Sequence, residues 1–421
     1  MASRVSGPDP FCPAYRPDVD SESLTVEYVL LGLRFDRLVR GFVDSYTGDP
    51  ALRHQVAAEP PPEPARLAAD AQRLRAEVAA SDLAEPRRRF LTAQLTALEC
   101  SGRRMAGEPV PFVAEVEACF QVTPTPGDPD EYQRVHRELG ALLPGRGPVA
   151  ERLRAVRSRD VVPADRLAVA LEAVLSALRD RVRARFELPV GETVEYRVVT
   201  DRPWAAFSHY AGGFRSKVAV NADVGHRASN LPQLLAHEAY PGHHTEHCRK
   251  EAGLVRRDGL VEHTVFLVNT PQCVLAEGLA DLGLHAAVGP GWGPWAAEVF
   301  ADLGIRVDGA LAERIDAVLL GLLPVRQDAL LMLHGGADEA DAVAHLQRWL
   351  LMPEQRARHL VRFMTDPLWR AYTTTYVEGY RLLRRWLDER PAGTSSADRY
   401  RRLLDEPLVP DSVRAELGAG V

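Results

Sequence analysis

One stretch of this 421-residue chain restricts its possible folds more than any other, because it concentrates chemically demanding side chains. Residues 230–248 read Asn-Leu-Pro-Gln-Leu-Leu-Ala-His-Glu-Ala-Tyr-Pro-Gly-His-His-Thr-Glu-His-Cys. Four of the thirteen histidines lie there, and two glutamates stand between them: His237, His243, His244 and His247, with Glu238 and Glu246. A hydrophobic core does not accommodate that many imidazoles without polar partners. Neutral imidazole is the commonest protein ligand for zinc, so the stretch predicts a metal site.

The spacing of the histidines requires a break in the helix that carries them. The pattern His-Glu-x-x-His grips a metal from one helix face, but position 241 here is Pro241. On an unbroken helix, His244 would lie ~10.5 Å along the axis from His237, too far for two Zn–N bonds of about 2.0–2.1 Å. Pro241 cannot donate a helical hydrogen bond, and Gly242 accepts unusual backbone angles. We therefore expect the helix to end between His237 and His243.

The segment His-Glu-Ala-Tyr-Pro-Gly-His-His, residues 237–244, resembles the signature of the domain-of-unknown-function 885 family, which belongs with the zincin-like metallopeptidases. The similarity extends over residues 186–387, and more loosely over the N-terminal helices. It includes residues 216–221, Glu277-Gly278-Leu279-Ala280 and residues 372–380. The family's usual glutamine soon after the double histidine is replaced by Thr245-Glu246-His247. The resemblance implies a mainly α, zincin-like fold and zinc-dependent peptidase activity.

The resemblance also implies a set of metal ligands. In glutamate-type zincins the third ligand is a Glu on a later helix, and an acid four residues further on orients a ligand histidine. Glu277 and Asp281 match these two positions, and Asp281 would take the orienting role. We therefore expect one zinc ion held by His237, His243 and Glu277, with water at the fourth position. His244, which directly follows His243, is a rival for the second ligand.

Two kinds of catalytic group are expected beside the ligands. Glu238 would be the general base, because the residue after the first ligand points toward water at the metal. Hydrolysis also needs a donor to the developing oxyanion, and Tyr376 and His209 are our candidates. Tyr376 lies in a Tyr-x-x-Gly sequence that resembles a recurrent feature of the family near its C-terminus, although aromatic stripes at helical spacing are more often core.

Substrate-binding residues are expected near the same site. Arg215 and Arg326 are candidates for holding a substrate carboxylate through a bidentate fork. Asn221 ends a predicted short strand, residues 217–221, which we expect at the edge of a sheet. An extended peptide could then pair with this strand through backbone hydrogen bonds.

Other interpretations of the cluster stand beside this one. Residues 243–247 also fit the inverted pattern His-x-x-Glu-His, in which His243 and His247 bind the metal and Glu246 is the base. The four histidines could instead only cap one another near the surface. The alternative functions are a metal-dependent enzyme that acts on a non-peptide small molecule, and a non-catalytic helical protein with a structural or vestigial metal site.

Outside the cluster, the sequence has the pattern of a mainly α protein. Apolar residues recur at three- and four-residue spacing in most segments of the chain. Alternating apolar residues predict two short strands, 193–199 and 217–221, just before the cluster. We therefore expect an N-terminal helical region, residues 1–185, and a metal-binding catalytic region, residues 186–421, packed as one unit. A small β-sheet should lie next to the active-site helix.

Charge and composition argue against several partners. A net charge of −7 and an isoelectric point near 6.0 disfavour a nucleic-acid surface, which needs a basic face. No apolar run reaches about 18 residues, so no membrane span is expected, and residues 1–10 lack the apolar region of a signal peptide. Five widely spaced cysteines without a Cys-x-x-Cys favour a reduced, cytoplasmic chain. The expected protein is thus a soluble zinc hydrolase that acts on a small peptide or amide.

Overall fold

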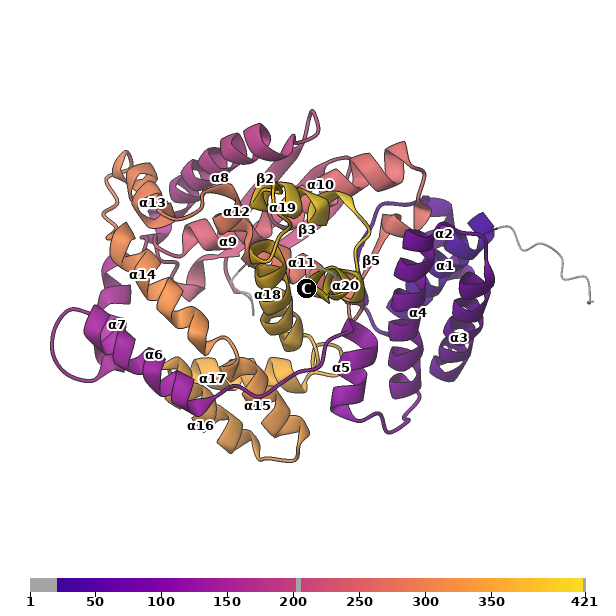
Figure 1. Cartoon of the computed structure of the whole chain (residues 1–421), viewed down its shortest axis with the longest axis horizontal. Helices are drawn as coiled ribbons and strands as arrows, with labels where there is room; N and C mark the ends of the chain where they lie inside the picture. The colour runs from indigo at the N-terminus through magenta and orange to yellow at the C-terminus, as the bar shows by residue number, and fades with distance from the viewer. Residues whose placement is uncertain (1–20, 202–205, 419–421) are drawn as a thin grey trace, which may run out of the picture.

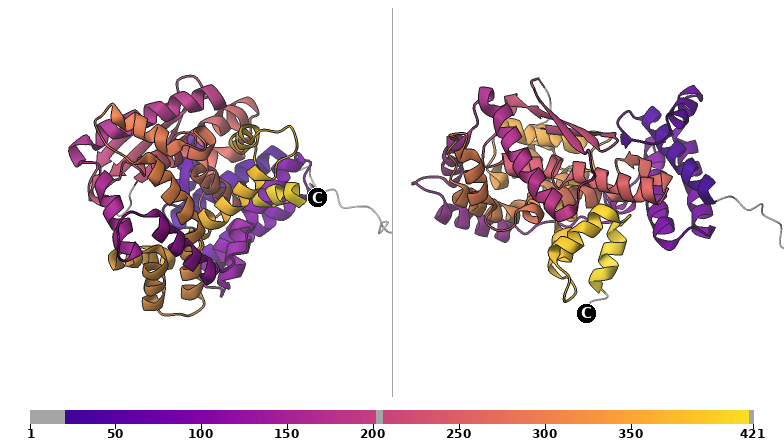
Figure 2. Two further views of the ribbon diagram at one scale, coloured as in Figure 1. Left: turned by 60° about the vertical axis from the view of Figure 1, so that its left-hand side comes forward. Right: turned by 90° about the horizontal axis from the view of Figure 1, so that it is seen from above.

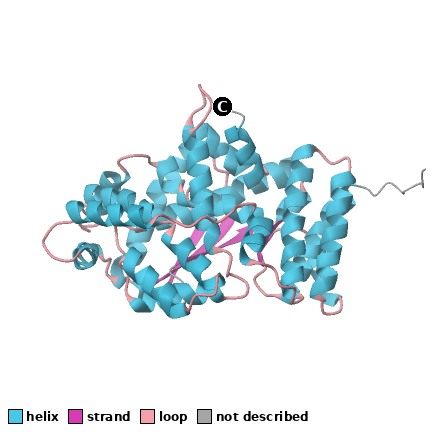
Figure 3. Ribbon diagram, turned by 60° about the horizontal axis from the view of Figure 1, so that its bottom comes forward, coloured by secondary structure: helices cyan, strands magenta, loops and turns pink. Residues whose placement is uncertain are grey.

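The computed structural model describes residues 21–201 and 206–418. This part is mainly α-helical, as the sequence predicted, with two small sheets (Figures 1 and 3). The expectation of no signal peptide falls on residues 1–10, which lie outside the described residues. Among the described helices, none combines the length and the apolar composition that a bilayer crossing requires. The helices are α1 (Ser21–Leu38), α2 (Pro50–Ala58), α3 (Pro64–Ala80), α4 (Glu85–Met105), α5 (Phe112–Phe120), α6 (Pro129–Leu142), α7 (Val149–Arg157), α8 (Ala164–Phe186), α9 (Leu231–Glu238), α10 (His243–Lys250), α11 (Pro271–Asp281), α12 (Gly283–Ala287), α13 (Trp292–Ala301), α14 (Gly309–Leu319), α15 (Val325–His334), α16 (Glu339–Leu350), α17 (Glu354–Thr365), α18 (Thr373–Asp388), α19 (Ser396–Asp405) and α20 (Pro410–Gly418).

A three-stranded sheet contacts the histidine-bearing helices α9 and α10. Its order is β2 (Thr193–Val199), β4 (Arg215–Asn221), β3 (Ala206–Gly212), with β2 and β4 parallel and β3 and β4 antiparallel. The two predicted strands are confirmed as β2 and β4. The expected edge position of residues 217–221 is wrong, because the chain turns at Gly212-Gly213 and β3 pairs with the second side of β4. With a neighbour on each side, β4 has no free edge for an added peptide strand.

A second, two-stranded sheet joins β1 (Val43–Tyr46) to β5 (Val265–Leu267) in antiparallel register. Val43 faces Leu267 and Ser45 faces Phe266, so Asp44 is an extra residue in a β-bulge. A bulge redirects the side chain it carries and is frequent next to functional sites. The sequence did not predict β1 or β5, because segments of three and four residues are too short to show a period.

Three hydrophobic clusters hold the described chain together. In the first, α1, α3 and α4 pack on β5 and the first half of α11, through residues such as Leu95, Leu267 and Val274. The second joins α8, α9 and the rest of α11, through residues such as Leu235 and Leu279. The third joins α6 to α15, α16 and α17. Helix α11 therefore lies between the N-terminal helices, which form one end of the molecule, and the remaining helices (Figure 2).

Helices α11 and α18 cross at two glycines. A Cβ atom on Gly278 would lie 2.5 Å from the carbonyl carbon of Gly379, and one on Gly379 would lie 2.3 Å from the carbonyl oxygen of Val274. Real Cβ atoms do not approach other heavy atoms closer than 3.0 Å. Only glycine therefore allows these two backbones to come so close. The crossing places Glu277 of α11 within hydrogen-bonding distance of Tyr372, at the start of α18.

Candidate metal centre

The histidine stretch folds as two helices separated by a break. Helix α9 ends at Glu238 and α10 begins at His243, so the break predicted from the spacing is confirmed. The Tyr240–Pro241 peptide is cis, and the backbone N–H of Gly242 donates to the carbonyl of Ala236 at 2.8 Å. A Cβ atom on Gly242 would lie 1.9 Å from the carbonyl oxygen of His237. Glycine is therefore required for the chain to fold back this tightly.

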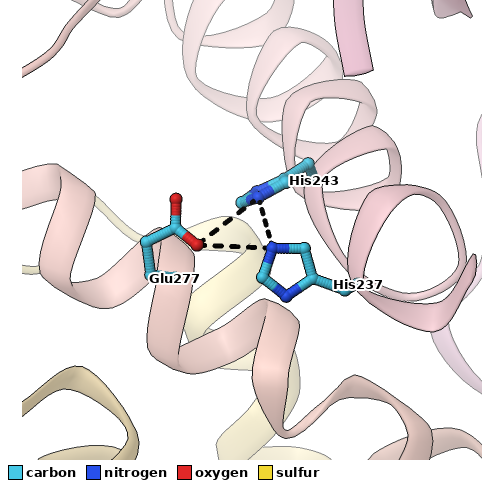
Figure 4. A group of neighbouring side chains, drawn as sticks. All are labelled: His237, His243 and Glu277. Carbon is cyan, nitrogen blue, oxygen red and sulfur yellow. Dashed lines mark hydrogen bonds and ion pairs between the residues drawn. The ribbon is translucent and has the colours of Figure 1, made fainter. Parts of the chain in front are cut away.

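The break brings three potential ligand atoms together (Figure 4). The Nε2 atoms of His237 and His243 are 3.2 Å apart. The Oε2 atom of Glu277 lies 3.3 Å from the first and 3.8 Å from the second. Zn–N and Zn–O bonds of about 2.0–2.2 Å in a tetrahedron place neighbouring ligand atoms ~3.3 Å apart. The three atoms thus approximate one face of a zinc-sized tetrahedron.

Hydrogen bonds around the group orient these atoms. Asp281 Oδ1 lies 2.9 Å from Nδ1 of His237, which leaves Nε2 facing the other two residues. The hydroxyl of Tyr372 donates to Oε1 of Glu277 at 2.8 Å. Oε2 of Glu277 is buried and has no hydrogen-bond partner among the described residues. A buried carboxylate oxygen without a partner is costly, and a cation at this position would satisfy it.

The charges of the group also favour a cation. Burial alone would lower the pKa of His237, but the nearby carboxylates of Asp281 and Glu277 outweigh it and raise that pKa well above its ordinary value. Burial alone would raise the pKa of Glu277, but His237 and His243 hold it below its ordinary value. Asp281 and Glu277 therefore stabilise a positive charge between them, and a proton on His237 supplies that charge when no metal is bound.

The expected catalytic groups lie around this group. Glu238 has no hydrogen bond or ion pair within the described part of the chain, and burial raises its pKa, with Glu277 and Asp281 adding to the effect. Tyr376 packs edge-on against Tyr372 with ring centroids 5.8 Å apart. Burial raises the pKa of Tyr376 well above its ordinary value, and the nearby charges of Glu277, Asp281 and Glu238 add to this. Both side chains thus lie within the electrostatic range of the candidate ligands.

His244 does not join the metal group, which makes it a poor rival to His243. Its Nδ1 lies 2.8 Å from the hydroxyl of Ser216 on β4, and its Nε2 lies 3.2 Å from Glu192. Glu192 also accepts hydrogen bonds from Tyr240 at 2.6 Å and from Arg179 of α8 at 2.7 Å. Both ring nitrogens of His244 are thus engaged away from the ligands. They anchor the start of α10 to the sheet and to α8.

The inverted pattern is not assembled either. Glu246 forms an ion pair with Lys250. His247 stacks on Tyr210, with ring centroids 4.7 Å apart. Within the described residues, the group of potential ligand atoms contains His243 but neither of these two side chains. The acid that lies close enough to feel the charges of His237, His243 and Glu277 is Glu238 and not Glu246.

The remaining predicted residues lie at different places. His209 is exposed on β3, and its charge acts on Asp44 and His247. Arg215 is exposed at the start of β4. Asn221, at the other end of β4, is buried and accepts a hydrogen bond from the backbone of residue 223. Arg326 of α15 lines a cavity next to Asp281.

Two residues near the group were not predicted from the sequence. Asp44, in the β-bulge, lies close enough to His243, His209 and Glu277 for their charges to act on it, while burial raises its pKa. Glu192 is buried just before β2, where it anchors both sides of the break. Neither belongs to a motif, so only the folded chain shows their place.

The comparisons with known proteins identify structural neighbours and no named relative. No family model and no curated protein matches the sequence. A solved structure described as a "putative lipoprotein of unknown function from Shewanella oneidensis" aligns with 94% of this chain and 73% of its own, at a TM-score of 0.52 and 15% identity. A "putative lipoprotein from Colwellia psychrerythraea" aligns with 83% of this chain at a TM-score of 0.49 and 15% identity, and this chain spans 65% of its length. The first likeness shows a shared fold.

Proposed function

We propose that this protein is a zinc-dependent hydrolase of peptide or amide bonds, allied to the zincin-like metallopeptidases that its signature resembles. One observation carries the proposal. His237, His243 and Glu277 place three ligand atoms within 3.8 Å of one another, and the carboxylate oxygen among them is buried without a hydrogen-bond partner. This donor set of two imidazoles and a carboxylate suits zinc and leaves one tetrahedral position open.

A zinc ion held by these three residues would polarise a substrate carbonyl and lower the pKa of a water molecule. Glu238 would take a proton from the attacking water and pass it to the nitrogen of the leaving amine as the C–N bond breaks. Its raised pKa suits this role, because a base is most effective when its pKa lies near the working pH. Tyr376, or His209 from β3, would donate to the developing oxyanion.

The same features argue against a purely structural metal. Structural zinc sites are closed by four protein ligands, often cysteines. The group within the described residues offers three, and Glu238 lies beside it without a partner. A half-buried acid without a partner beside a group of potential metal ligands destabilises the fold and is a typical feature of a catalytic site.

The proposal is tested by measuring metal content and hydrolysis together. Purified protein should contain about one zinc, and Glu277→Gln should lose most of it. Glu238→Gln should keep the zinc but lose hydrolysis of a peptide library by 10²–10⁴-fold. Glu339→Gln, at an exposed acid on α16, is the matched control and should behave as wild type. Hydrolysis that resists chelators and is equal in all three variants would exclude the mechanism.

We further propose a cytoplasmic location, on the number and spacing of the cysteines. The descriptions of the two solved structures as lipoproteins favour export instead. Fractionation of cells that produce the full-length protein at its natural level separates the two locations.

A further inference from the structure

A cavity of about 660 Å³ adjoins the candidate metal centre. Asp281 and Gln233 line it, and the side-chain amide of Gln233 donates to the backbone carbonyl of Asp281 at 2.9 Å. Gln233 lies four residues before His237 on α9, so the two side chains share one helix face. The cavity therefore begins beside the histidine that Asp281 orients. Four arginines from four different segments line it: Arg157, Arg227, Arg326 and Arg356.

None of these four arginines forms an ion pair with a carboxylate within residues 21–201 and 206–418. Arg227 makes only long contacts to Ser229 and Asn230, at 3.5 and 3.3 Å. The Nε atom of Arg157 is buried and has no hydrogen-bond partner among the described residues. By contrast Arg384, which also lines the cavity, pairs with Asp388. Arg157, Arg227 and Arg326 are half-buried, whereas Arg356 is more exposed. The lack of an ion pair is unusual for the three half-buried guanidinium groups, because charges withdrawn from water are normally paired.

The four guanidinium groups line one cavity and lie near enough for their charges to act on one another. Burial lowers the pKa of Arg157 to about 10, and the charges of Arg227 and Arg356 add to the effect. Burial also lowers the pKa of Arg356, with contributions from Arg326 and Arg227. Like charges held together in this way repel unless an anion lies between them.

The protein supplies little negative charge of its own here. Asp316 lines the cavity and faces Arg157 and Arg227, but burial still raises its pKa. Asp281 is engaged by His237, and Glu313 accepts hydrogen bonds from the backbone of Gly291 and Gly293. Asp160, which does not line this cavity, also acts on Arg157 and Arg227. Among the described residues, two aspartates without an ion pair, Asp316 and Asp160, therefore stand against four arginines without one. The surplus of positive charge predicts an anionic ligand.

We propose that this cavity binds a carboxylate of the substrate, so that the enzyme prefers acidic peptides or amides. The proposal rests on the proposed function, because the cavity opens beside the ligand histidine. Arginine matches a carboxylate through two parallel hydrogen bonds. Leu319, Leu323 and Trp292 also line the cavity, which suits an aliphatic body behind the charged group. Its size is within the range of small-molecule sites, about 300–1,000 Å³.

Binding can be tested without catalysis. Isothermal titration calorimetry of the metal-free protein should detect glutarate, a dicarboxylate with an aliphatic body. Arg157→Met and Arg356→Met should each weaken its binding at least tenfold. Arg154→Gln, at an exposed arginine on the same helix as Arg157 that does not line the cavity, is the matched control and should bind as wild type. No binding of glutarate, or equal binding by all variants, would overturn the proposal. So would tighter binding of inorganic phosphate, which would mark a phosphate site.

Stability distinguishes a binding arginine from a structural one. Because Arg157 is repelled by its neighbours and lacks a partner, Arg157→Met should keep or raise the midpoint of thermal unfolding. Addition of glutarate should raise the midpoint of the wild type but not that of the variant. A large fall of the midpoint in both Arg157→Met and Arg356→Met would identify the arginines as structural and contradict the proposal.

Peptide pairs then separate the two possible sources of the carboxylate. One pair differs by a free or an amidated C-terminus, and the other by glutamate or glutamine next to the cleaved bond. The carboxylate form of at least one pair should have a KM at least tenfold lower, and Arg356→Met should remove that difference while leaving kcat similar. Hydrolysis of both pairs without discrimination would overturn the inference alone. Binding of glutarate without hydrolysis of any peptide would instead contradict the proposed function.

Discussion

Replacing Gly278 by alanine should weaken metal binding without touching a ligand. The added Cβ atom would lie 2.5 Å from the carbonyl group of Gly379, whereas ordinary contacts begin at 3.4 Å, so α11 and α18 must separate by about 0.9 Å. Metal–ligand distances tolerate only about ±0.2 Å. Glu277 is the neighbouring residue and would move with the helix, away from His237 or away from Tyr372. We expect a loss of zinc affinity of about 10–100-fold, comparable to the loss of a residue that orients a ligand.

The effect on stability should be small, because two contributions oppose each other. Overpacking costs about 1–3 kcal/mol, and replacing glycine by alanine inside a helix gains about 1 kcal/mol. The matched control is Gly140→Ala in α6, where the new Cβ atom would meet only the side chain of Val149 at 3.5 Å. That variant should be more stable by about 0.5–1 kcal/mol and should bind zinc as the wild type does.

Zinc affinity is measured by competition with a chromophoric chelator, and the free energy of unfolding by urea titration of the metal-free protein. In Gly278→Ala the zinc affinity should fall with little change in the free energy of unfolding, whereas in Gly140→Ala only the free energy of unfolding should change. Wild-type zinc affinity in Gly278→Ala would show that the crossing does not position Glu277. A loss of zinc affinity that appears only at urea concentrations that unfold the chain would also show that the crossing does not position Glu277.

Further variants test the other contacts of the site. His243→Ala should lose zinc with little change in the free energy of unfolding. His244→Ala should lower the free energy of unfolding by about 1–3 kcal/mol, because it removes one of the contacts of the buried Glu192 and the partner of the Ser216 hydroxyl. Loss of zinc in His244→Ala alone would reverse the assignment of the ligand. Hydrogen bonds from His244, Tyr240 and Arg179 outweigh burial and lower the pKa of Glu192 to about 2. The contribution of the Glu192 carboxylate to stability is therefore complete above the unfolded pKa of about 4.5 and is lost as the pH falls toward 2. Urea titrations from pH 6 to pH 2 should show this acid dependence in the wild type and not in Glu192→Gln. Because the pKa of His237 is raised, zinc should displace a proton from this residue and bind more tightly as the pH rises. Titration calorimetry in two buffers of different ionisation enthalpy should detect the released proton. Equal heats of binding in the two buffers would contradict this prediction. Asp281→Asn should reduce zinc affinity about 10–100-fold with the fold intact, as circular dichroism and chelator competition would show.

The features that the sequence predicted are those fixed by local backbone chemistry. Helical periodicity and the alternation in residues 193–199 depend on residues a few positions apart. The break between α9 and α10 follows from the spacing of His237 and His243 and from the properties of proline and glycine. Glu277 was reached through a family resemblance, because no spacing rule connects residue 237 to residue 277.

The features that the sequence did not predict depend on contacts between distant segments. From the sequence His243 was the expected ligand and His244 its rival, because the break before these adjacent residues allows either side chain to face Glu277. The choice is made by Ser216 and Glu192, which engage both nitrogens of His244. The edge position assigned to residues 217–221 failed for a similar reason, because the pairing partner β3 has no apolar alternation of its own. The arginines of the cavity come from four segments that only the tertiary fold brings together.

The site is held from two sides by contacts that do not involve a metal. The anchoring of His244 and Tyr240 by Glu192 fixes the two helices that carry the histidines. The glycine crossing and the hydrogen bond from Tyr372 fix the helix that carries Glu277. Both sets of contacts are buried, so the three ligand atoms are already close together before a cation binds. A site formed in this way loses little conformational entropy on metal binding. It would also keep Glu238 and the arginine-lined cavity at fixed positions relative to a bound metal, as the proposed hydrolysis of an anionic substrate requires.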